Sequence, residues 1–281
     1  DLAGAIKYNH HDIRNVLERA SARETAARVA VGALARQFLE YFGVCFASHV
    51  VQIGTVKVTG DVDTGDLDEL VKRTEVSPVR CVDPDIEGLM VKDIEAAGQE
   101  GDSLGGVAQI IVKGIPAGLG GFSQWDQRLD GRLAASGMSI PSVKGVEIGH
   151  GFEFSGHRGS QAQDEIHYEQ GRKPEGKAFY RTSNRAGGIE GGISNGEDIV
   201  FNLAVKPIST LGKPLRTVDI ATKKPSDAMV ERADTCVVPA VAVVGEAVAA
   251  LVLADAFIAK FGGDNMTEIE SHYKAYRDRL F

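Results

Sequence analysis

Apolar residues recur at helical spacing in a segment near the start of the chain, from about residue 22 to 41. Its core-facing positions are expected to include Val29, Leu34, Phe38 and Leu39. Spacings of three and four residues predict an amphipathic helix with one apolar face. Gly43 follows the segment, and glycine commonly lies just beyond the end of a helix. A long helix that ends before Gly43 is therefore predicted.

A second long helix is predicted from about residue 238 to 260, where most positions are apolar and alanine is common. Glu246 and Asp255 interrupt this run. Because charged groups inside a membrane span are costly, we expect a core helix buried on most sides and not a membrane span. Both long helices follow a charged, arginine-containing segment, and both end in Phe-Gly. This similarity suggests an internal pseudo-repeat, although two alanine-rich helices can match by chance.

Four short runs of apolar or alternating residues predict strands, at residues 44–53, 107–112, 143–148 and 199–205. Because these strands and the helices do not alternate regularly, the pattern favours an α+β fold over a doubly wound sheet. Long helices are expected to cover the sheets.

Between the strands, Asp83 followed by Pro84 is a helix start, with an N-cap and a proline at the first helical position. The apolar face of that helix is expected to comprise Ile86, Met90, Ile94 and Ala97. A further helix is predicted from Asp126 to Ala135. The polar segments 61–68 and 170–177 predict a surface turn and a mobile excursion.

The composition excludes some classes of function but does not identify one. The 281 residues carry a net charge of −8 with a pI near 5.4, which argues against general nucleic-acid binding. Three widely spaced cysteines indicate neither a disulfide framework nor a zinc site, so a reducing, cytoplasmic location is expected, and no metal is. No signal peptide is visible, and a start at Asp1 without methionine suggests that the chain is cut.

The strongest local signal is the segment Arg-Ala-Ser-Ala-Arg-Glu from Arg19 to Glu24. Ser21 and Glu24 fit a capping box at the start of the first long helix. Free N–H groups at a helix start, flanked by Arg19 and Arg23, would form a site for phosphate or carboxylate. An ordinary capped helix with surface arginines explains the same residues.

Three more segments combine small or polar residues with a positive charge: 183–193, 206–210 and 232–236. Each has an ordinary structural explanation, as a glycine turn, an exposed strand end or a local ion pair. The glycines from Gly187 to Gly192 do not form Gly-x-Gly-x-x-Gly, so a dinucleotide fingerprint is unsupported.

Taken in order, these segments resemble the chorismate synthase family. The shared motifs begin at Arg19 (RASARET), Gly101 (GDSLGG), Gly114 (GIPAGLG), Arg128 (RLD), Val143 (VKGVEIG), Arg158 (RGS), Ser183 (SNRAGG), Lys206 (KPIST) and Arg232 (RADT). They run along essentially the whole chain, which makes the resemblance specific. It implies a β-α-β sandwich in one domain spanning residues 1–281, and a homotetramer.

The resemblance also implies a reaction. The family eliminates phosphate and a proton from 5-enolpyruvylshikimate-3-phosphate to give chorismate, and it requires reduced FMN although the reaction involves no net redox change. No nucleic-acid or membrane partner is implied. Whether such a chain reduces its own flavin with NADPH or depends on an external reductant stays open.

The family's motifs assign roles to particular residues. The flavin-binding positions are Arg19, Ala20, Ser21, Pro141, Ser142, Gly191, Lys206, Pro207, Ile208, Ser209, Thr210 and Arg232. Arg23 and Arg232 are expected to bind the anionic substrate. Asp234 matches the acidic residue assigned to proton transfer, and Arg232 could keep it ionised.

Two departures from the family pattern stand out. Asp1 resembles the final aspartate of the family's Arg-Pro-Gly-His-Ala-Asp motif, which implies that both catalytic histidines lie upstream of this chain. The chain is therefore expected to be N-terminally truncated and not to turn over by itself. His10 and His11 cannot replace those histidines. Gly137 stands where the family has leucine, which predicts unfilled volume beside the site. The alternative hypothesis is a catalytically incomplete fragment that only binds flavin or assembles with other subunits.

Overall fold

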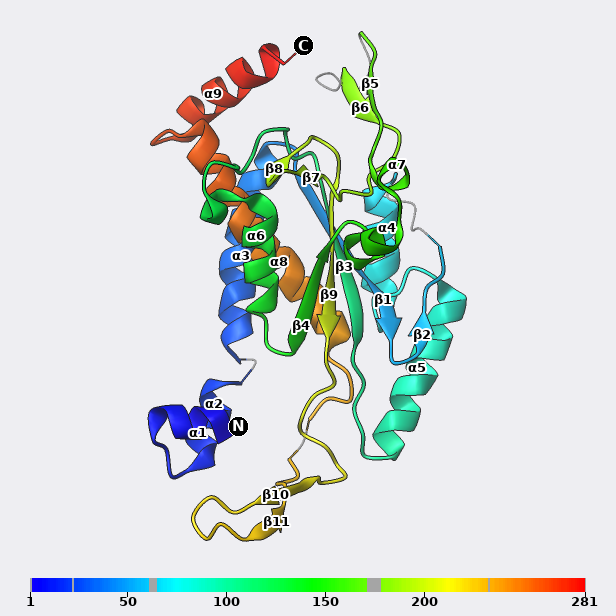
Figure 1. The fold of residues 1–281 in the computed structure, drawn as a ribbon, viewed down its shortest axis with the longest axis vertical. Helices are drawn as coiled ribbons and strands as arrows, with labels where there is room; N and C mark the ends of the chain where they lie inside the picture. The colour runs from blue at the N-terminus through cyan, green and yellow to red at the C-terminus, as the bar shows by residue number, and fades with distance from the viewer. Residues whose placement is uncertain (1, 22, 61–64, 171–177, 232, 281) are drawn as a thin grey trace.

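A five-stranded antiparallel sheet forms the centre of the computed structural model, which describes residues 2–21, 23–60, 65–170, 178–231 and 233–280 (Figure 1). In sheet order the strands are β2 (Val56–Lys57), β1 (Cys45–Ile53), β3 (Gly106–Lys113), β9 (Ile199–Val205) and β4 (Val143–Ile148). The four strands predicted from apolar runs are confirmed within one residue at each end, and so is the mixed α+β class.

Three helices cover one face of this sheet: α3 (Arg23–Tyr41), α6 (Leu129–Met138) and α8 (Val238–Phe261). The backbones of α3 and α8 approach closely, because a Cβ atom built on Gly32 would lie 2.6 Å from the Cβ of Ala247. Gly245 of α8 lies equally close to the sheet, because a Cβ atom built on it would lie 2.7 Å from Ile110 Cδ1. Small residues therefore set the spacing between the helices and the sheet.

A buried ion cluster ties α8 to α3 and β1. The Glu246 carboxylate accepts hydrogen bonds from Arg36 Nη1 at 2.7 Å and from Ser48 Oγ at 2.5 Å. Arg80 Nη2 approaches the same carboxylate at 3.6 Å. Although α8 is long and apolar enough to cross a membrane, most of it is buried inside the protein. The prediction of a core helix is confirmed.

The opposite face of the sheet packs against α4 (Leu67–Val76), while α5 (Pro84–Gln99) lies near β2 and β1. Leu67 and Leu70 of α4 bury against Ala47 and Ile111 of the sheet. Sequence reasoning missed α4, because its start falls in the acidic segment 61–68 that was predicted as a turn. Of that segment, residues 61–64 lie outside the described residues.

The start of α5 agrees with its prediction. Asp83 Oδ1 accepts from the backbone N–H groups of Asp85 and Ile86, and Pro84 is the first helical residue. Met90 is fully buried on the predicted apolar face. The N-cap and the proline together fix where this helix begins.

A row of polar side chains crosses the α4 side of the sheet. His49 Nε2 bonds Gln109 Oε1, Gln109 Nε2 donates to Asn202 Oδ1, and Asn202 Nδ2 donates to Glu147 Oε2, each at 3.0 Å. These four residues are direct cross-strand partners in β1, β3, β9 and β4. Because the Gln109 amide nitrogen donates to Asn202, the Gln109 oxygen faces His49. His49 therefore carries a hydrogen on Nε2 and donates it to this oxygen. We call these residues the polar row.

The remaining elements lie around the ends and edges of the sheet. They are α1 (Leu2–Tyr8), α2 (Ile13–Arg19), η1 (Trp125–Gln127), η2 (Gly151–Gly156), α7 (Gly159–Ala162), the hairpins β5 (Ile166–Tyr168) with β6 (Phe179–Arg181), β7 (Ile189–Glu190) with β8 (Ile193–Ser194), and β10 (Arg216–Val218) with β11 (Pro225–Asp227), and α9 (Met266–Asp278). In Figure 1, β7–β8 and β5–β6 lie above the sheet, whereas α1, α2 and β10–β11 lie below it.

Three sequence predictions need correction. Leu34 is 67% exposed, because α3 turns Gly32 and Leu39 toward the core and Leu34 away from it. The helix predicted from residue 126 begins at Leu129, after a short 3-10 turn. Gly137 leaves no unfilled volume, because a Cβ there would lie 2.8 Å from Leu203 Cδ2. Residues 171–177 of the predicted excursion lie outside the described residues.

Candidate functional site

The residues singled out in the sequence fall at two opposite ends of the sheet. We call the first the Lys206 end, where β9 ends and β3 begins, because Gly106 pairs with Val205. The second is the Gly191 end, where β9 begins and β3 ends, because Val112 pairs with Ile199. At about 3.3 Å per residue, the seven residues of β9 separate the two ends by roughly 20 Å.

At the Lys206 end, two hydrogen bonds and one close approach at a glycine hold the segment 206–210. Lys206 N–H donates to Ser142 O at 2.9 Å, and Ser103 Oγ donates to Ile208 O at 2.7 Å. A Cβ on Gly105 would lie 2.9 Å from Pro207, so this close approach requires glycine. Lys206, Pro207 and Ser209 are exposed, while Ile208 and Thr210 are partly buried. The structure thus brings the predicted Ser142 and Lys206 segments together.

Ser142 has a positive φ of 71°. This left-handed conformation is unusual for a residue other than glycine and costs energy. It places the Ser142 carbonyl where it accepts the Lys206 N–H. The neighbouring Pro141 fixes the preceding backbone.

Asp234 lies at the same end, just before α8, and is exposed. The following residue, Thr235, accepts from Leu104 N–H at 2.8 Å through its carbonyl. The segment from Ser103 to Gly105 therefore contacts both the Lys206 segment and the Asp234 segment. Arg232, predicted to bind flavin and substrate, lies outside the described residues.

The connection from α2 to α3 contains the predicted residues Arg19, Ala20, Ser21 and Arg23. Helix α3 begins one residue later than predicted. Arg19 and Ala20 line a pocket of about 460 Å³ together with Tyr8 and His10. Arg23 pairs with Glu18, and this contact lowers the pKa of the Glu18 carboxyl below its usual value. The next residue, Glu24, forms an ion pair with Arg28 one turn further along α3.

Arg28 links this segment to the Lys206 end. Its Nη1 donates to Ser139 Oγ at 2.7 Å, and Ser139 closely precedes Ser142. The start of α3 therefore faces the turn that leads into β4. Arg19 and Arg23 themselves are exposed.

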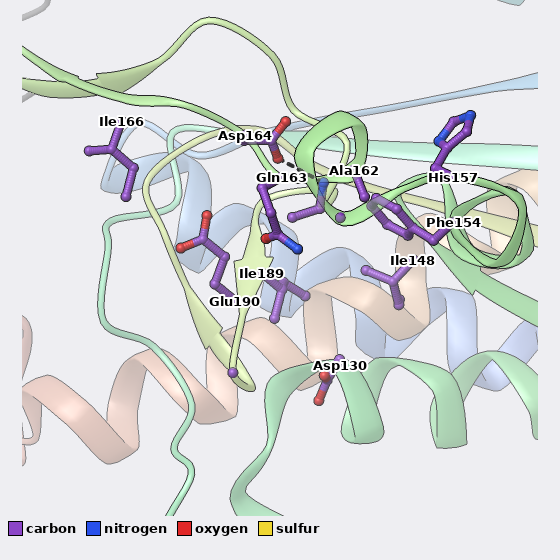
Figure 2. Close-up of a pocket in the computed structure, with 13 residues that line it drawn as sticks. Asp130, Ile148, Phe154, His157, Ala162, Gln163, Asp164, Ile166, Ile189 and Glu190 are labelled. Atoms are coloured by element: carbon purple, nitrogen blue, oxygen red, sulfur yellow. Dashed lines mark hydrogen bonds between the residues drawn. The ribbon is translucent and has the colours of Figure 1, made fainter.

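Gly191 lies at the opposite end, in a pocket of about 690 Å³ (Figure 2). The apolar part of its wall consists of Ile148, Phe154, Ala162, Ile166, Ala186 and Ile189. Gly191 has a φ of 59°, and a Cβ placed there would meet nothing within 4 Å. The glycine therefore exposes its backbone to open space, so that a flat ligand could approach it closely.

The carboxylates in this pocket are already partnered. Glu190 forms a bidentate pair with Arg181, at 2.6 and 2.8 Å. Asp130 pairs with Arg128, and Asp164 accepts from the segment 183–186. Among the described residues that line the pocket there is no lysine or arginine, so it offers mainly an apolar surface and backbone groups.

Sequence reasoning missed most of this pocket. Ala162, Gln163 and Asp164 lie in the wall beside Gly191, whereas the predicted Pro141 and Ser142 do not. The Arg-Gly-Ser motif at Arg158 and the glycine-rich segment 183–193 were noticed, and they flank these residues. Nothing in their spacing indicates that they meet, because the contact depends on how the loops fold back over the sheet.

Comparisons with known proteins agree along the whole chain. The sequence model of the family described as chorismate synthase matches residues 1–258. Chorismate synthase from Desulforudis audaxviator is 54% identical over 280 residues, which is 100% of this chain and 70% of that protein. The Carboxydothermus hydrogenoformans protein of the same name is 51% identical and covers 98% of this chain and 70% of its own length.

A solved structure gives the same result for the fold. A protein described as "Crystal Structure of Chorismate Synthase" superimposes with a TM-score of 0.85 at 42% identity, covering 100% of this chain and 76% of that one. Both the sequence and the architecture are thus shared over the full length of the chain. The chain belongs to the chorismate synthase family.

Proposed function

We propose that this chain supplies the carbon-oxygen lyase activity of chorismate synthase, the anti-1,4-elimination of phosphate from 5-enolpyruvylshikimate-3-phosphate. The observation that carries this proposal is the convergence of motifs at the Lys206 end. Ser142, the segment 206–210 and the segment Asp234–Thr235 come from three distant parts of the sequence, yet they are joined by hydrogen bonds that involve Ser142, Ser103 and Leu104.

The charges at this end fit an anionic cofactor and substrate. Arg19 and Lys206 are exposed, and within the described part of the chain neither has a recorded ion pair. Cations without acidic partners can bind phosphate and carboxylate groups. The net charge of −8 makes such a local cluster necessary for anion binding.

Reduced FMN is the proposed cofactor, and when bound it would supply electron density to the allylic system as phosphate leaves. Arg19, Ala20, Ser21, Ser142 and the segment 206–210 would hold it. Pro141 and Arg232 are also proposed to bind FMN, on the basis of the family motifs alone. The source of electrons for the flavin, NADPH or another reductant, is a separate experimental question.

The substrate would be held by Arg23, which must then exchange its contact with Glu18 for a substrate anion. Arg232 is proposed as a second substrate-binding cation from its motif alone. Asp234 is exposed beside the Lys206 segment and is proposed to take part in proton transfer. The protein's contribution is then to orient the substrate and to stabilise charge as phosphate departs.

Gly191 cannot join the Lys206 end within one chain, because β9 separates them by roughly 20 Å. We therefore propose that a second copy contributes its Gly191 pocket, whose apolar wall suits the flavin ring. An arrangement in which each copy completes the site of the other favours a homo-oligomer with closed symmetry. The homotetramer expected from the family is consistent with such pairing.

We also retain the finer fold assignment, a single-domain β-α-β sandwich with an internal pseudo-repeat. A second sheet would then lie on the outer face of α3, where Val31, Leu34 and Tyr41 are exposed. The matching α3 and α8, packed against each other, support the repeat. A cytoplasmic location is proposed from the free cysteines.

The decisive experiment combines binding and turnover. FMN binding is measured by quenching of its fluorescence, with and without 5-enolpyruvylshikimate-3-phosphate. Chorismate formation is then followed anaerobically with chemically reduced FMN. It is measured for the 281-residue chain and for a chimera that adds the part of the Desulforudis audaxviator sequence this chain does not cover.

We expect flavin binding that tightens with substrate, and chorismate from the chimera. Flavin binding without turnover in either protein would favour the alternative, a flavin-binding or assembly module. Absence of both binding and turnover would contradict the proposed function.

A further inference from the structure

Asp164 is a buried carboxylate with three protein donors. Its side chain is only 1% exposed. Oδ1 accepts from Ser183 Oγ at 2.5 Å and from Arg185 N–H at 2.9 Å, and Oδ2 accepts from Ala186 N–H at 2.9 Å. These bonds join the loop after α7 to the segment 183–186, which is about twenty residues away in sequence.

The segment held by Asp164 supports a third segment in turn. The carbonyl of Arg185 accepts from His150 N–H at 2.9 Å. A Cβ on Gly149 would lie 2.0 Å from the same carbonyl, so only glycine fits there. His150 leads directly into η2, which carries Phe154 into the pocket wall.

All three segments contribute to the pocket around Gly191 (Figure 2). Phe154 belongs to η2, Ala162 precedes Asp164, and Ala186 precedes the β7–β8 hairpin that carries Gly191. Asp164 supplies three of the hydrogen bonds that connect these walls, and Arg185 Nη1 adds one to the Gln163 carbonyl at 3.2 Å. Loss of the Asp164 bonds would loosen the walls without removing a single apolar lining residue.

Its electrostatic state suits this structural role. Burial opposes the charge on Asp164, but the hydrogen bonds from Ser183, Ala186 and Arg185 outweigh burial, so the pKa of this carboxyl lies below its usual value. Asp164 therefore remains an acceptor at neutral pH. Because Ser183, Arg185 and Ala186 occupy it, the carboxylate is directed toward the protein.

We propose that Asp164 is a positioning residue that holds the Gly191 pocket in its flavin-binding shape through its bonds to the segment 183–186. The inference rests on the proposed function. It adds a residue that the family motifs do not assign, and a reason why the Asp164 and Ser183 segments occur together.

The test is Asp164→Asn in the full chain, with Glu165→Gln as a matched control. An asparagine would direct its own N–H groups at backbone N–H donors, so at least one of these would lose its partner. Glu165 is the adjacent acid, and its side chain is 81% exposed. FMN binding by fluorescence quenching and hydrogen exchange at Arg185 and Ala186 are the two measurements.

For Asp164→Asn we expect at least tenfold weaker FMN binding and at least tenfold faster exchange at both amides. Glu165→Gln should stay within twofold of the unaltered chain. Unchanged FMN affinity in Asp164→Asn would overturn the inference, even if exchange became faster.

Ser183 provides a milder variant in case Asp164→Asn does not fold. Ser183→Ala removes one of the three bonds and should weaken FMN binding severalfold, whereas Ser183→Thr keeps the hydroxyl and should restore it. Equal affinities for the alanine and threonine variants would contradict the proposal. If neither the unaltered chain nor the chimera bound FMN or formed chorismate, the proposed function itself would fail and this inference with it.

Discussion

The two ends of the sheet differ in how their functional residues are held. At the Gly191 end, glycines occupy the left-handed positions, and buried hydrogen bonds fix the loops before any ligand arrives. At the Lys206 end, the charged side chains are exposed and a serine occupies the strained position. One end is therefore a preformed apolar wall, and the other is a charged surface that a ligand can organise.

The comparison assumes that the sheet and α8 act as a rigid spacer between the ends. The largest expected effect is therefore Glu246→Ala, which leaves Arg36 and Arg80 without their shared buried partner. We expect it to lower the free energy of unfolding by about 3–5 kcal/mol, measured by urea denaturation. Glu40→Ala removes only the exposed partner of Arg36 and should have a much smaller effect.

The preformed wall is tested by Gly149→Ala. The new methyl would collide with the Arg185 carbonyl, and the positive φ of 57° would add strain. We expect a loss of about 2–4 kcal/mol in unfolding free energy, from left-handed strain and overpacking together. Gly43→Ala has a similar φ of 83° but nothing within 4 Å, so it should show the strain alone. Equal losses in the two variants would contradict a close-packed wall.

The charged end is tested by Lys206→Ala. Loss of one cation from a phosphate contact should weaken FMN binding about tenfold. It should also reduce the dependence of binding on salt concentration, because surface charges are screened. Stability should change little, since the side chain is exposed. An unchanged salt dependence would show that Lys206 does not contact the flavin phosphate.

Between the ends, the polar row makes stability depend on pH through His49. Burial lowers the pKa of His49, and the bond to Gln109 offsets this only in part. The unfolded chain, with a pKa near 6.5, therefore takes up a proton before the folded protein does. Stability should fall as pH decreases below 6.5, by no more than about 1.4 kcal/mol at pH 5.5. Urea denaturation from pH 7.5 to 5.5 measures this loss, and His49→Gln should reduce it.

The smallest expected effect is that of Ser142→Gly. Glycine adopts a positive φ without penalty, so this variant should be more stable by about 1 kcal/mol. If the serine side chain also contacts flavin, FMN binding should weaken at the same time. Thermal denaturation and FMN titration of the same sample separate the two effects. A loss of stability would show that the Ser142 conformation is not strained.

Periodicity predicted the central sheet and the long helices well, because each buries a continuous apolar face. It failed for α4, whose acidic first turn resembles a loop, and for Leu34, since α3 packs on α8 through the small Gly32 as well as through Phe38. Hydrophobic size alone does not reveal such a small-residue contact. Only the folded arrangement of the helices does.

The candidate site was predicted in part. Motifs indicated the Ser142 and Lys206 segments, and the structure joins them through a hydrogen bond. They also indicated Gly191, without showing that it lies at the other end of the sheet. The wall formed around Asp164 was missed, because its contacts link loops about twenty residues apart that have no regular periodicity.

The polar row also determines how the strands align. Apolar alternation distinguishes the two faces of a strand, so it excludes a slip of one residue but not a slip of two. A two-residue slip of β9 against β3 would set Gln109 opposite Val200 or Ala204 instead of Asn202. Two amides would then lose their partners in a partly buried layer. The four polar side chains thus select one strand register from the several that the hydrophobic pattern alone would permit.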